Sequence, residues 1–426
     1  MHDTIFALSS GAPPAGIGII RISGPDAGEA LKALTGRALP APRQARLAQL
    51  VDPRSGDVLD RAVTLWFPGP STVTGEDLAE LHCHGGRAVI AAVQDALASR
   101  SGLRLAAPGE FTRRAFLNGR IDLNAVEGLS DLLAAETQQQ RRAALLMAEG
   151  HFSRRVKGWR SALLDISAMA EAALDFSDED DVPDAGIETR IHRQLEDLAA
   201  EVETLLEAPS AERLRDGVRV VLAGPPNVGK STLLNALVGR DAAIVSDIAG
   251  TTRDRIEVPA ALGGVAFLFT DTAGLRDQSD DPVEMIGIDR ARLALAAADI
   301  ILWLGEPTEL PRDDAILIAA QTDRLPTRTG LPISAVTGAG MDQLVDMLLD
   351  RARCLLPGPG DYALHQRQRD GASKLLGHLK AAHGARDLLI TAEELRQARN
   401  AIDQLTGQAG TEDMLDRLFA GFCIGK

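Results

Sequence analysis

The sequence predicts a multidomain fold with three parts: a small α+β domain, an all-α helical domain, and an α/β domain inserted into the helical one. Three observations support this prediction. Short β-like runs broken by Gly and Pro turns fill the start of the chain, and sequence rich in Ala, Leu, Glu, Gln and Arg follows. β-like runs then alternate with helical segments before helical sequence returns. A chain of 426 residues is long enough for two or three domains.

The expected domain boundaries follow these changes of pattern. Residues 1–119 form the α+β domain, whose runs "IGIIRIS", "AVTLWFP" and "DLAELHCH" are typical of strands. Residues 120–213 and 357–426 are the two parts of the helical domain. Between them, residues 214–356 alternate strands such as "VRVVLAG" and "DIILWLG" with helices, which predicts a parallel sheet with crossover helices.

Composition and charge narrow the function classes. Apolar residues make up 45% of the chain and charged residues 25%, as in ordinary folded proteins. A net charge of −15 argues against binding nucleic acid by bulk charge. Local basic patches remain possible RNA contacts, although such runs are usually solvated helix faces. The candidates are Arg113, Arg114, Arg141, Arg142 and the run Arg154–Arg160.

The cysteines and the apolar runs indicate the cellular compartment in which the protein is expected. Cys83, Cys354 and Cys423 are too far apart for a disulfide framework or a zinc site. The opening "MHDTIFALSSG" lacks the pattern of a secretory signal, and no apolar run approaches the length of a membrane span. We therefore expect a soluble cytoplasmic protein with no membrane partner.

A phosphate-binding loop is the strongest motif. "GPPNVGKS", from Gly224 to Ser231, fits G-x-x-x-x-G-K-[ST], with a predicted strand before it and a helix after it. Glycines let backbone N–H groups close around phosphate oxygens. Lys230 would reach the β- and γ-phosphates and Ser231 would bind Mg²⁺. The other predicted nucleotide contacts in this loop are Asn227, Val228, Gly229 and Thr232.

Two further elements follow in the order expected of a GTPase. "GTTRD", from Gly250 to Asp254, supplies Thr252, which can close over Mg²⁺ and the γ-phosphate. "DTAG", from Asp271 through Thr272 and Ala273 to Gly274, ends a β-like run. Its Asp would reach Mg²⁺ through water, and the Gly274 N–H would sense the γ-phosphate. Together the three elements predict a GTPase domain of the translation-factor type that binds GTP and Mg²⁺.

The base-recognition motif departs from the usual pattern. A GTPase is expected to carry N-K-x-D after the fourth strand, but residues 320–323 read "AQTD". Asp323 can still accept hydrogen bonds from guanine, and the backbone of Ser334 and Ala335 in "ISAVTGAG" could contact its O6. We therefore expect a preference for guanine with weakened affinity.

The residue after DxxG raises a question about hydrolysis. Ras-type GTPases place a Gln there to orient the attacking water, whereas this chain has Leu275, which cannot hold a water. The inserted GTPase domain carries "GPPNVGKST", "SDIAGTTRD" and "DTAGLRD", the chain ends in "FCIGK", and the first domain contains "PPAGIGIIRISG", "TGEDLAELHCHGG" and "PGEFTRRAFLNGRIDL". In this combination of motifs the sequence resembles the MnmE/TrmE family of tRNA-modification GTPases.

The resemblance implies an answer to that question. It implies a K⁺ ion and two GTPase domains that meet face to face. Motif matching assigns K⁺ to Asn227, Ser246, Ile248 and Thr251, with Ser246 and Thr251 also near the nucleotide. The resemblance further implies that Glu284 positions the attacking water. The predicted catalytic residues are therefore Glu284 and the phosphate-binding Lys230. The inserted Pro282 in "DDPVEMIG" departs from the family spacing.

The resemblance also implies a folate site in the first domain. The ligand would be a 5-formyl- or methylene-tetrahydrofolate derivative, and motif matching points to Arg21, Glu80, Arg120 and Lys426. Many family members have Lys where this chain has Arg120. Cys423 in the C-terminal tail is a possible functional thiol. His82 and His84 in "HCHGG" have no further ligand cluster nearby, so we interpret them as strand residues rather than metal ligands.

The overall expectation is a homodimeric, K⁺-stimulated GTPase. The resemblance implies a heterotetramer with an FAD-dependent partner of the MnmG type. Together they would add a carboxymethylaminomethyl group to C5 of the wobble uridine, U34, in certain tRNAs. Two alternatives stay open. One is a ribosome-assembly GTPase, and the other is a nucleotide-gated binding switch that barely hydrolyses GTP. Leu275 and "AQTD" favour the switch, whereas Asn227 and Glu284 oppose it.

Overall fold

A computed structural model describes most of the chain. The described residues are 3–175, 186–207, 211–239, 257–271, 292–324, 329–358, 361, 363–407, 412–422 and 424–425. The chain divides into two compact units, one of Met1–Val126 with Thr406–Lys426 and the other of Glu127–Leu405. Among the described helices, none is long and apolar enough to cross a membrane.

The first unit is built around a mixed sheet. Its strands lie in the order β3-β4-β5-β2-β1-β6, with β1 and β6 parallel and every other pair antiparallel. The strands are β1 (Thr4–Leu8), β2 (Ala15–Ser23), β3 (Arg46–Val51), β4 (Val58–Phe67), β5 (Leu78–Gly85) and β6 (Leu103–Leu105). The helices are α1 (Ala27–Thr35), α2 (Arg87–Ala98), α3 (Glu110–Leu117) and α14 (Glu412–Ala420).

Strand alternation gives this sheet two different faces. Ile20 and Leu81 point into a core that also contains Leu31 of α1 and Val93 of α2. Because successive strand side chains point to opposite faces, Arg21 and Glu80 lie on the other face. There Phe111 of α3 packs with Ile5 and Ala7 of β1. The sheet therefore buries one face under two helices and presents polar side chains beside α3 on the other.

The C-terminal segment of the chain belongs to this same unit. Phe419 of α14 packs against Phe116 of α3, with ring centroids 6.3 Å apart. Pro108 and Ile424 form an isolated antiparallel bridge. Gly109 has a φ of 65°, and a Cβ there would lie 2.5 Å from the backbone oxygen of Phe419. A residue without a side chain is therefore needed where the two segments meet.

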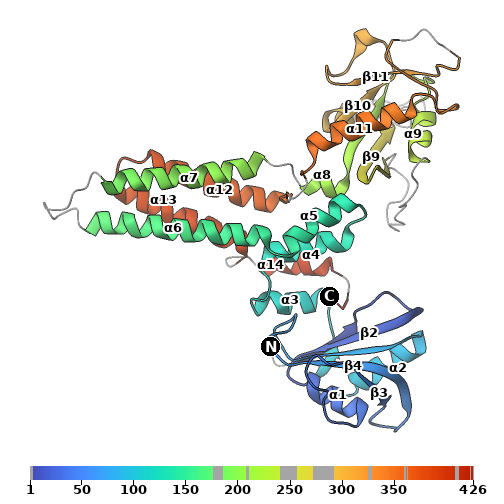
Figure 1. Cartoon of the computed structure of the whole chain (residues 1–426), viewed down its shortest axis with the longest axis vertical. Coiled ribbons are helices and arrows are strands. Elements are labelled where there is room, and N and C mark those ends of the chain that lie inside the picture. The colour runs from blue at the N-terminus through green and yellow to red at the C-terminus, as the bar shows by residue number, and fades with distance from the viewer. Residues whose placement is uncertain are drawn as a thin grey trace, which may run out of the picture. The chain divides into compact units, whose positions relative to one another are not determined.

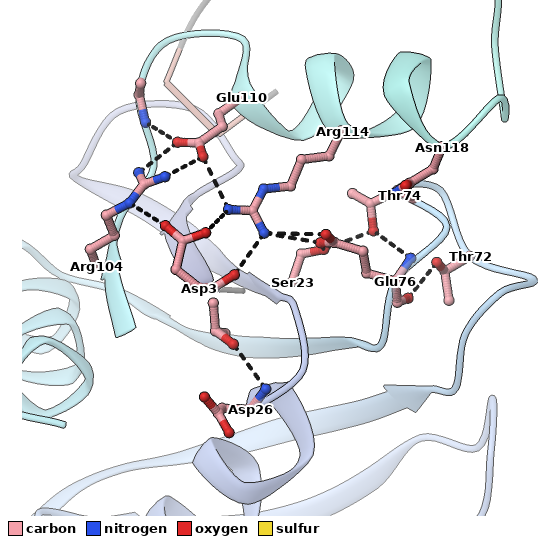
Figure 2. Close-up of polar contacts among 12 residues, drawn as sticks. Asp3, Ser23, Asp26, Thr72, Thr74, Glu76, Arg104, Glu110, Arg114 and Asn118 are labelled. Carbon is pink, nitrogen blue, oxygen red and sulfur yellow. Dashed lines mark hydrogen bonds and ion pairs between the residues drawn. The ribbon is translucent and has the colours of Figure 1, made fainter. Parts of the chain in front are cut away.

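A buried arginine ties α3 to the rest of the first unit (Figure 2). Arg114 is only 1% exposed. Its guanidinium donates to Oδ1 of Asp3 at 2.9 Å, to Oε2 of Glu76 at 3.1 Å and to Oε1 of Glu110 at 3.1 Å. Arg104 also donates to Glu110, at 2.8 Å and 2.5 Å. A buried cation of this kind needs such paired carboxylates to offset its desolvation.

The same cluster fixes the loop before β5. Ser23, at the end of β2, donates to Oε2 of Glu76 at 2.8 Å and lies 2.7 Å from the hydroxyl of Thr74. Asn118 donates to the backbone oxygen of Thr74 at 2.7 Å, and Thr72 donates to that of Glu76 at 2.6 Å. Figure 2 shows Ser23, Thr72 and Thr74 gathered around Glu76, which in turn contacts Arg114. The loop from Thr72 to Glu76 is thus held by hydrogen bonds from both sides.

The second unit contains a helical part and an α/β part. In the helical part, α6, α7, α12 and α13 lie side by side (Figure 1) and share one apolar core. Trp159 of α6 is buried there, edge-on to Phe152, and its Nε1 donates to Glu201 at 2.9 Å. The helices are α5 (Gln138–Ala148), α6 (His151–Asp175), α7 (Ile187–Glu207), α12 (Gln366–Gly384), most of α4 (Leu123–Ala134), whose first turn is in the first unit, and α13 (Leu388–Thr406), whose last residue is in the first unit.

The α/β part of the second unit is a mostly parallel sheet. Its strands lie in the order β12-β11-β10-β7-β9-β8, and only β8 is antiparallel to its neighbour among these six. They are β7 (Val218–Ala223), β8 (Glu257–Leu262), β9 (Val265–Asp271), β10 (Ile300–Trp303), β11 (Ile316–Ala320) and β12 (Leu331–Ile333). The described helices here are α8 (Ala211–Asp216), α9 (Lys230–Val238), α11 (Met341–Leu355) and the short 3₁₀ helix η3 (Pro307–Glu309).

The predicted fold class is confirmed. This α/β part lies in sequence between α7 and α12, as expected for a domain inserted into a helical one. Polar contacts anchor both crossing segments to the helical part: Gln140 donates to the backbone oxygen of Leu214 at 3.0 Å, and His365 lies 2.7 Å from Asp131. Burial lowers the pKa of His365, but Asp131 outweighs this effect and the net shift is upward. The boundaries at 119, 213 and 356 stay predictions.

Two helical glycines give a matched test of the packing between α4 and α5. A Cβ on Gly128 of α4 would lie 2.5 Å from the backbone nitrogen of Ala148 in α5, whereas a Cβ on Gly158 of α6 meets nothing within 4 Å. We expect Gly128→Ala to lower the free energy of unfolding by about 1–3 kcal/mol through overpacking. Gly158→Ala should raise it by about 0.4–1 kcal/mol. Urea unfolding followed by circular dichroism at 222 nm measures both, and equal effects would contradict the close α4–α5 contact.

The Arg114 cluster predicts an acid-sensitive first unit. Burial alone would raise the pKa of Glu110, but hydrogen bonds from Arg104, the Ala107 N–H and Arg114 outweigh it and lower the pKa. A lowered carboxyl pKa stabilises the fold above its ordinary value of 4.5, and this contribution is lost as the pH falls through the folded-state pKa. Arg114→Met should cost about 3–5 kcal/mol at pH 7 because it leaves buried carboxylates unpaired.

The matched control for this substitution is Lys32→Met, which removes the same charge from an exposed pair with Glu29. It should cost less than about 1 kcal/mol. Unfolding is followed by the fluorescence of Trp66, with Trp159 and Trp303 replaced by Phe. The difference in free energy of unfolding between the unsubstituted protein and Arg114→Met should shrink below pH 4.5. A difference that does not change with pH would show that the carboxylates do not stabilise this unit.

Candidate functional site

The carboxyl ends of five parallel strands define one edge of the second unit's sheet. Gly224 follows β7, Asp271 ends β9, Asp323 lies three residues after β11, and Ser334 follows β12. The register places Leu222 of β7 opposite Asp271. In open α/β sheets, ligands bind at this carboxyl edge. The structure therefore brings predicted phosphate, metal and base contacts to one edge.

The phosphate loop turns sharply from β7 into α9. Gly224, Asn227 and Gly229 have φ values of 147°, 59° and 99°. A Cβ on Gly224 would lie 3.0 Å from the backbone carbon of Leu304, so this position requires glycine. Asn227 is exposed and adopts the left-handed conformation that Asn tolerates better than most residues. The loop ends at the N-terminus of α9, whose free N–H groups and dipole favour an anion.

Lys230 is almost completely buried within this loop. It is 4% exposed, and its Nζ donates to the backbone oxygens of Gly224 at 3.0 Å and Pro225 at 2.7 Å. Those contacts hold the ammonium group inside the loop. Val228 and Gly229 are half-buried, whereas Thr232 is exposed in the first turn of α9. A cation held within a ring of backbone groups is suited to binding phosphate.

A hydroxyl and a carboxylate meet beside the phosphate loop. The Oγ of Ser231 donates to Oδ2 of Asp271 at 2.5 Å, and Asp271 is 3% exposed. Hard divalent cations such as Mg²⁺ prefer oxygen ligands and are usually held by one or two protein groups together with substrate phosphates. This pair of oxygens fits such an ion.

At the other end of the edge, Asp323 is fixed by a serine side chain. Ser334 is 1% exposed, and its Oγ donates to Oδ1 of Asp323 at 2.8 Å. The Thr337 N–H donates to the same Oγ at 3.2 Å. The sequence predicted only a backbone role for Ser334 and Ala335. The hydrogen bond from its hydroxyl to Asp323 was not predicted, because that bond depends on the pairing of β11 with β12.

In the first unit, the predicted folate residues lie in two places. Arg21 and Glu80 are on the paired strands β2 and β5, and Arg120 contacts the loop before β5. Arg21 and Glu80 are cross-strand partners, with Nη2 of Arg21 2.9 Å from Oε1 of Glu80. The Arg21 guanidinium also lies 5.9 Å from the ring centroid of Phe111. Arg120 is held by the loop before β5, where its Nε donates to the backbone oxygen of Thr72 at 3.1 Å.

Both histidines of "HCHGG" are paired with carboxylates. His82 lies 3.4 Å from Glu80, and His84 lies 2.7 Å from Asp60. Burial alone would raise the pKa of Asp60, but hydrogen bonds from the backbone and side chain of His84 outweigh it and lower the pKa. In the part of the chain that the structure describes, no group of three or more His, Cys, Asp or Glu side chains could hold a metal ion.

The basic clusters are largely engaged within the protein. Arg114 is buried, so it is not available to an RNA. Arg113 pairs with Asp416 at 3.1 Å and Arg160 with Asp403 at 3.3 Å. Arg155 lies over the ring of Trp159 at 5.7 Å. These three arginines therefore have partners within the protein, and their role as RNA contacts stays a prediction.

Several predicted residues lie outside the described part of the chain. For the nucleotide and K⁺ they are Ser246, Ile248, Thr251, Thr252, Thr272, Ala273, Gly274 and Glu284, and for the folate site and tail they are Lys426 and Cys423. Leu275 is also among them. Their roles stay predictions.

Comparison with known proteins agrees with this site. The family described as "GTP-binding protein TrmE N-terminus" matches residues 4–120, and the "MnmE helical domain" family matches residues 123–423. The chain is 59% identical to the tRNA modification GTPase MnmE of Rhizorhabdus wittichii, over 100% of this chain and 97% of that one. It is 57% identical to the protein of the same name from Novosphingobium aromaticivorans, over 100% of both chains.

Solved structures also include similar chains. The G domain of the T. maritima FeoB iron transporter is 25% identical over 32% of this chain and 98% of that one, with a TM-score of 0.23. The full-length relatives and the two matched families are decisive. The chain belongs to the MnmE family of tRNA-modification GTPases.

Proposed function

We propose that this GTPase hydrolyses GTP at the carboxyl edge of the second unit's sheet, with K⁺ stimulating turnover. The observation that supports it most is the contact between Ser231 and Asp271, 2.5 Å apart at the mouth of the phosphate loop. Ser231, together with Thr252, would bind Mg²⁺, and Asp271 would reach it through water. Lys230 would bind the β- and γ-phosphates.

Asn227 supports the proposed K⁺ site. Its side chain is exposed in the phosphate loop, and its amide oxygen is a suitable ligand for a hard cation. Ser246, Ile248 and Thr251 would complete the site. K⁺ bound there would offset negative charge developing on the transferred phosphate. Glu284 would orient the attacking water in the place of a glutamine, since Leu275 cannot.

Guanine would be read by Asp323. Its carboxylate can accept hydrogen bonds from N1–H and the exocyclic amine of guanine, which adenine does not present in that arrangement. The bond from Ser334 holds one carboxylate oxygen in place. Backbone groups of Ser334 and Ala335 would contact O6.

The first unit would hold the one-carbon carrier. Arg21, Glu80, Arg120 and Lys426 would bind a 5-formyl- or methylene-tetrahydrofolate derivative. The pairing of Arg21 with Glu80 beside Phe111 supports this, since a carboxylate suits the N–H edge of a pterin, a guanidinium suits acidic or carbonyl oxygens, and a ring offers a stacking face. Cys423 would contribute a functional thiol.

The proposed biological role is joint modification of tRNA. A homodimer would pair with an FAD-dependent partner of the MnmG type in a cytoplasmic heterotetramer. Together they would install a carboxymethylaminomethyl group at C5 of U34. The one-carbon unit would come from the folate, and the uridine chemistry would occur at the flavin partner. GTP hydrolysis would drive a conformational cycle rather than the bond-forming step.

Turnover in two salts tests the K⁺ proposal. We expect steady-state GTP hydrolysis to be at least about tenfold faster in KCl than in NaCl at equal ionic strength, because only K⁺ would complete the site. Asn227→Ala should remove most of that difference. ATP serves as the substrate control. Equal, slow turnover in both salts would favour the binding switch instead.

An isosteric change tests base reading by Asp323. Asp323→Asn keeps an acceptor for the Ser334 hydroxyl but replaces one carboxylate oxygen by a donor. GDP binding should weaken about 10- to 100-fold, since a charge-assisted hydrogen bond is lost. Xanthosine diphosphate, which carries an oxygen where guanine has its amine, should bind the variant better than GDP does. Isothermal titration measures both, and an unchanged GDP affinity would remove Asp323 from the base site.

A further inference from the structure

The chain passes between its two compact units at two junctions. One is Val126–Glu127, near the start of α4, and the other is Leu405–Thr406, at the end of α13. Within the first unit the two segments are in contact, because a Cβ on Gly407 would lie 2.8 Å from the Cβ of Leu123. Gly407 also has a φ of 82°, which suits glycine. The two junctions therefore lie side by side.

One side chain in the second unit binds the chain at both junctions. Arg367, in the first turn of α12, donates from Nε and Nη2 to the two carboxylate oxygens of Glu127, each at 2.7 Å. Its Nη1 donates to the backbone oxygen of Leu405 at 3.2 Å and to that of Gln404 at 3.4 Å. Both carbonyls are in the last turn of α13, where carbonyl groups lack a donor from their own helix. A planar guanidinium can make all these contacts at once, which an ammonium group cannot.

The packing around Arg367 makes this contact close and well supported. The side chains of Arg367 and Glu127 are only 24% and 11% exposed. Gln368, which is fully buried, also donates to Oε2 of Glu127, at 2.6 Å. One turn further along α12, a Cβ on Gly371 would lie 2.7 Å from Cδ2 of Leu405. Helix α12 thus holds α4 through a paired carboxylate, and it holds α13 through a carbonyl group and an apolar contact.

The residues just before Arg367 are bound to the segment that leads into the α/β part. The backbone oxygen of Leu364 accepts from the Ala211 N–H at 3.0 Å, and the Gln366 N–H donates to Oε1 of Glu212 at 3.0 Å. Ala211 and Glu212 begin α8, which is followed by β7 and the phosphate loop. The start of α12 is therefore linked on one side to the α/β part and on the other side to both junctions.

We propose that Arg367 couples the nucleotide site to the first unit by passing a displacement of α8 to the two junctions. A change at the phosphate loop that moves α8 also moves residues 364–366, because hydrogen bonds join them. Arg367 is the next residue, and it carries the movement to Glu127 and Leu405 together. The inference rests on the proposed function, because it takes nucleotide binding at the carboxyl edge of the sheet as the source of the change.

Hydrogen–deuterium exchange of the full chain, with and without GDP and Mg²⁺, tests the proposal. In the unsubstituted protein, GDP should slow exchange at least about fivefold in peptides covering residues 123–131 and 402–407, as allosteric coupling commonly does. Arg367→Met should abolish both effects. Arg367→Lys keeps the charge and can still pair with Glu127, but one ammonium group cannot also hold the Leu405 carbonyl. It should therefore lose the GDP effect at 402–407 and keep part of it at 123–131.

Two controls make the outcomes separable. Lys380→Met removes a cation from the same helix, where it pairs with Glu203 on the exposed face, and it should leave the GDP effect unchanged. Exchange in β4 of the first unit and GDP affinity by titration should be the same in every variant. Loss of the GDP effect with both of these unchanged cannot arise from misfolding.

The unsubstituted protein alone can already contradict the proposal. If it does not bind GDP, the proposed function fails and the inference fails with it. If it binds GDP but exchange at 123–131 and 402–407 stays the same, the proposed function stands and the coupling is overturned. If both Arg367 variants respond to GDP as the unsubstituted protein does, the role of Arg367 is overturned.

Discussion

The parallel pairing of β7 with β9 is the constraint on which the nucleotide site depends. Because Leu222 lies opposite Asp271, the carboxyl end of β9 arrives beside the loop that follows β7. Ser231 in the first turn of α9 then reaches the Asp271 carboxylate at 2.5 Å. A shift of one residue in this register would turn Asp271 to the opposite face of the sheet. The oxygen pair suited to a divalent cation would then no longer exist.

A second register, between β11 and β12, does the same for the base end. Ala320 lies opposite Ile333, so the residues after each strand meet as neighbours. Ser334 can then fix Asp323 at the base end of the site. Residues 320–323 depart from the usual base-recognition motif, and a hydrogen bond from Ser334 after the neighbouring strand holds their Asp323 in place.

How far the sequence predicted this structure depends on the range of each interaction. The phosphate loop was predictable because the strand, Gly224, Lys230 and helix are consecutive. The multidomain class followed from changes in pattern along the chain. The hydrogen bond from Ser334 to Asp323 depends on strand register, which a single sequence does not reveal. The run that contains Arg114 was interpreted as a solvated helix face. In the structure Arg114 is buried and pairs with Asp3 and Glu76, which are far from it in sequence. The pairing of Arg21 with Glu80 crosses 59 positions. The family resemblance assigned both residues to one site but did not indicate that they pair.

The central claim is that one sheet edge positions metal, phosphate and base together. A crystal structure of the protein with Mg²⁺ and a non-hydrolysable GTP analogue tests it most directly. The account predicts phosphates within residues 224–230, the metal bound to Ser231 near Asp271, and guanine on Asp323. A base bound away from Asp323, or a metal that does not contact Ser231, would contradict it.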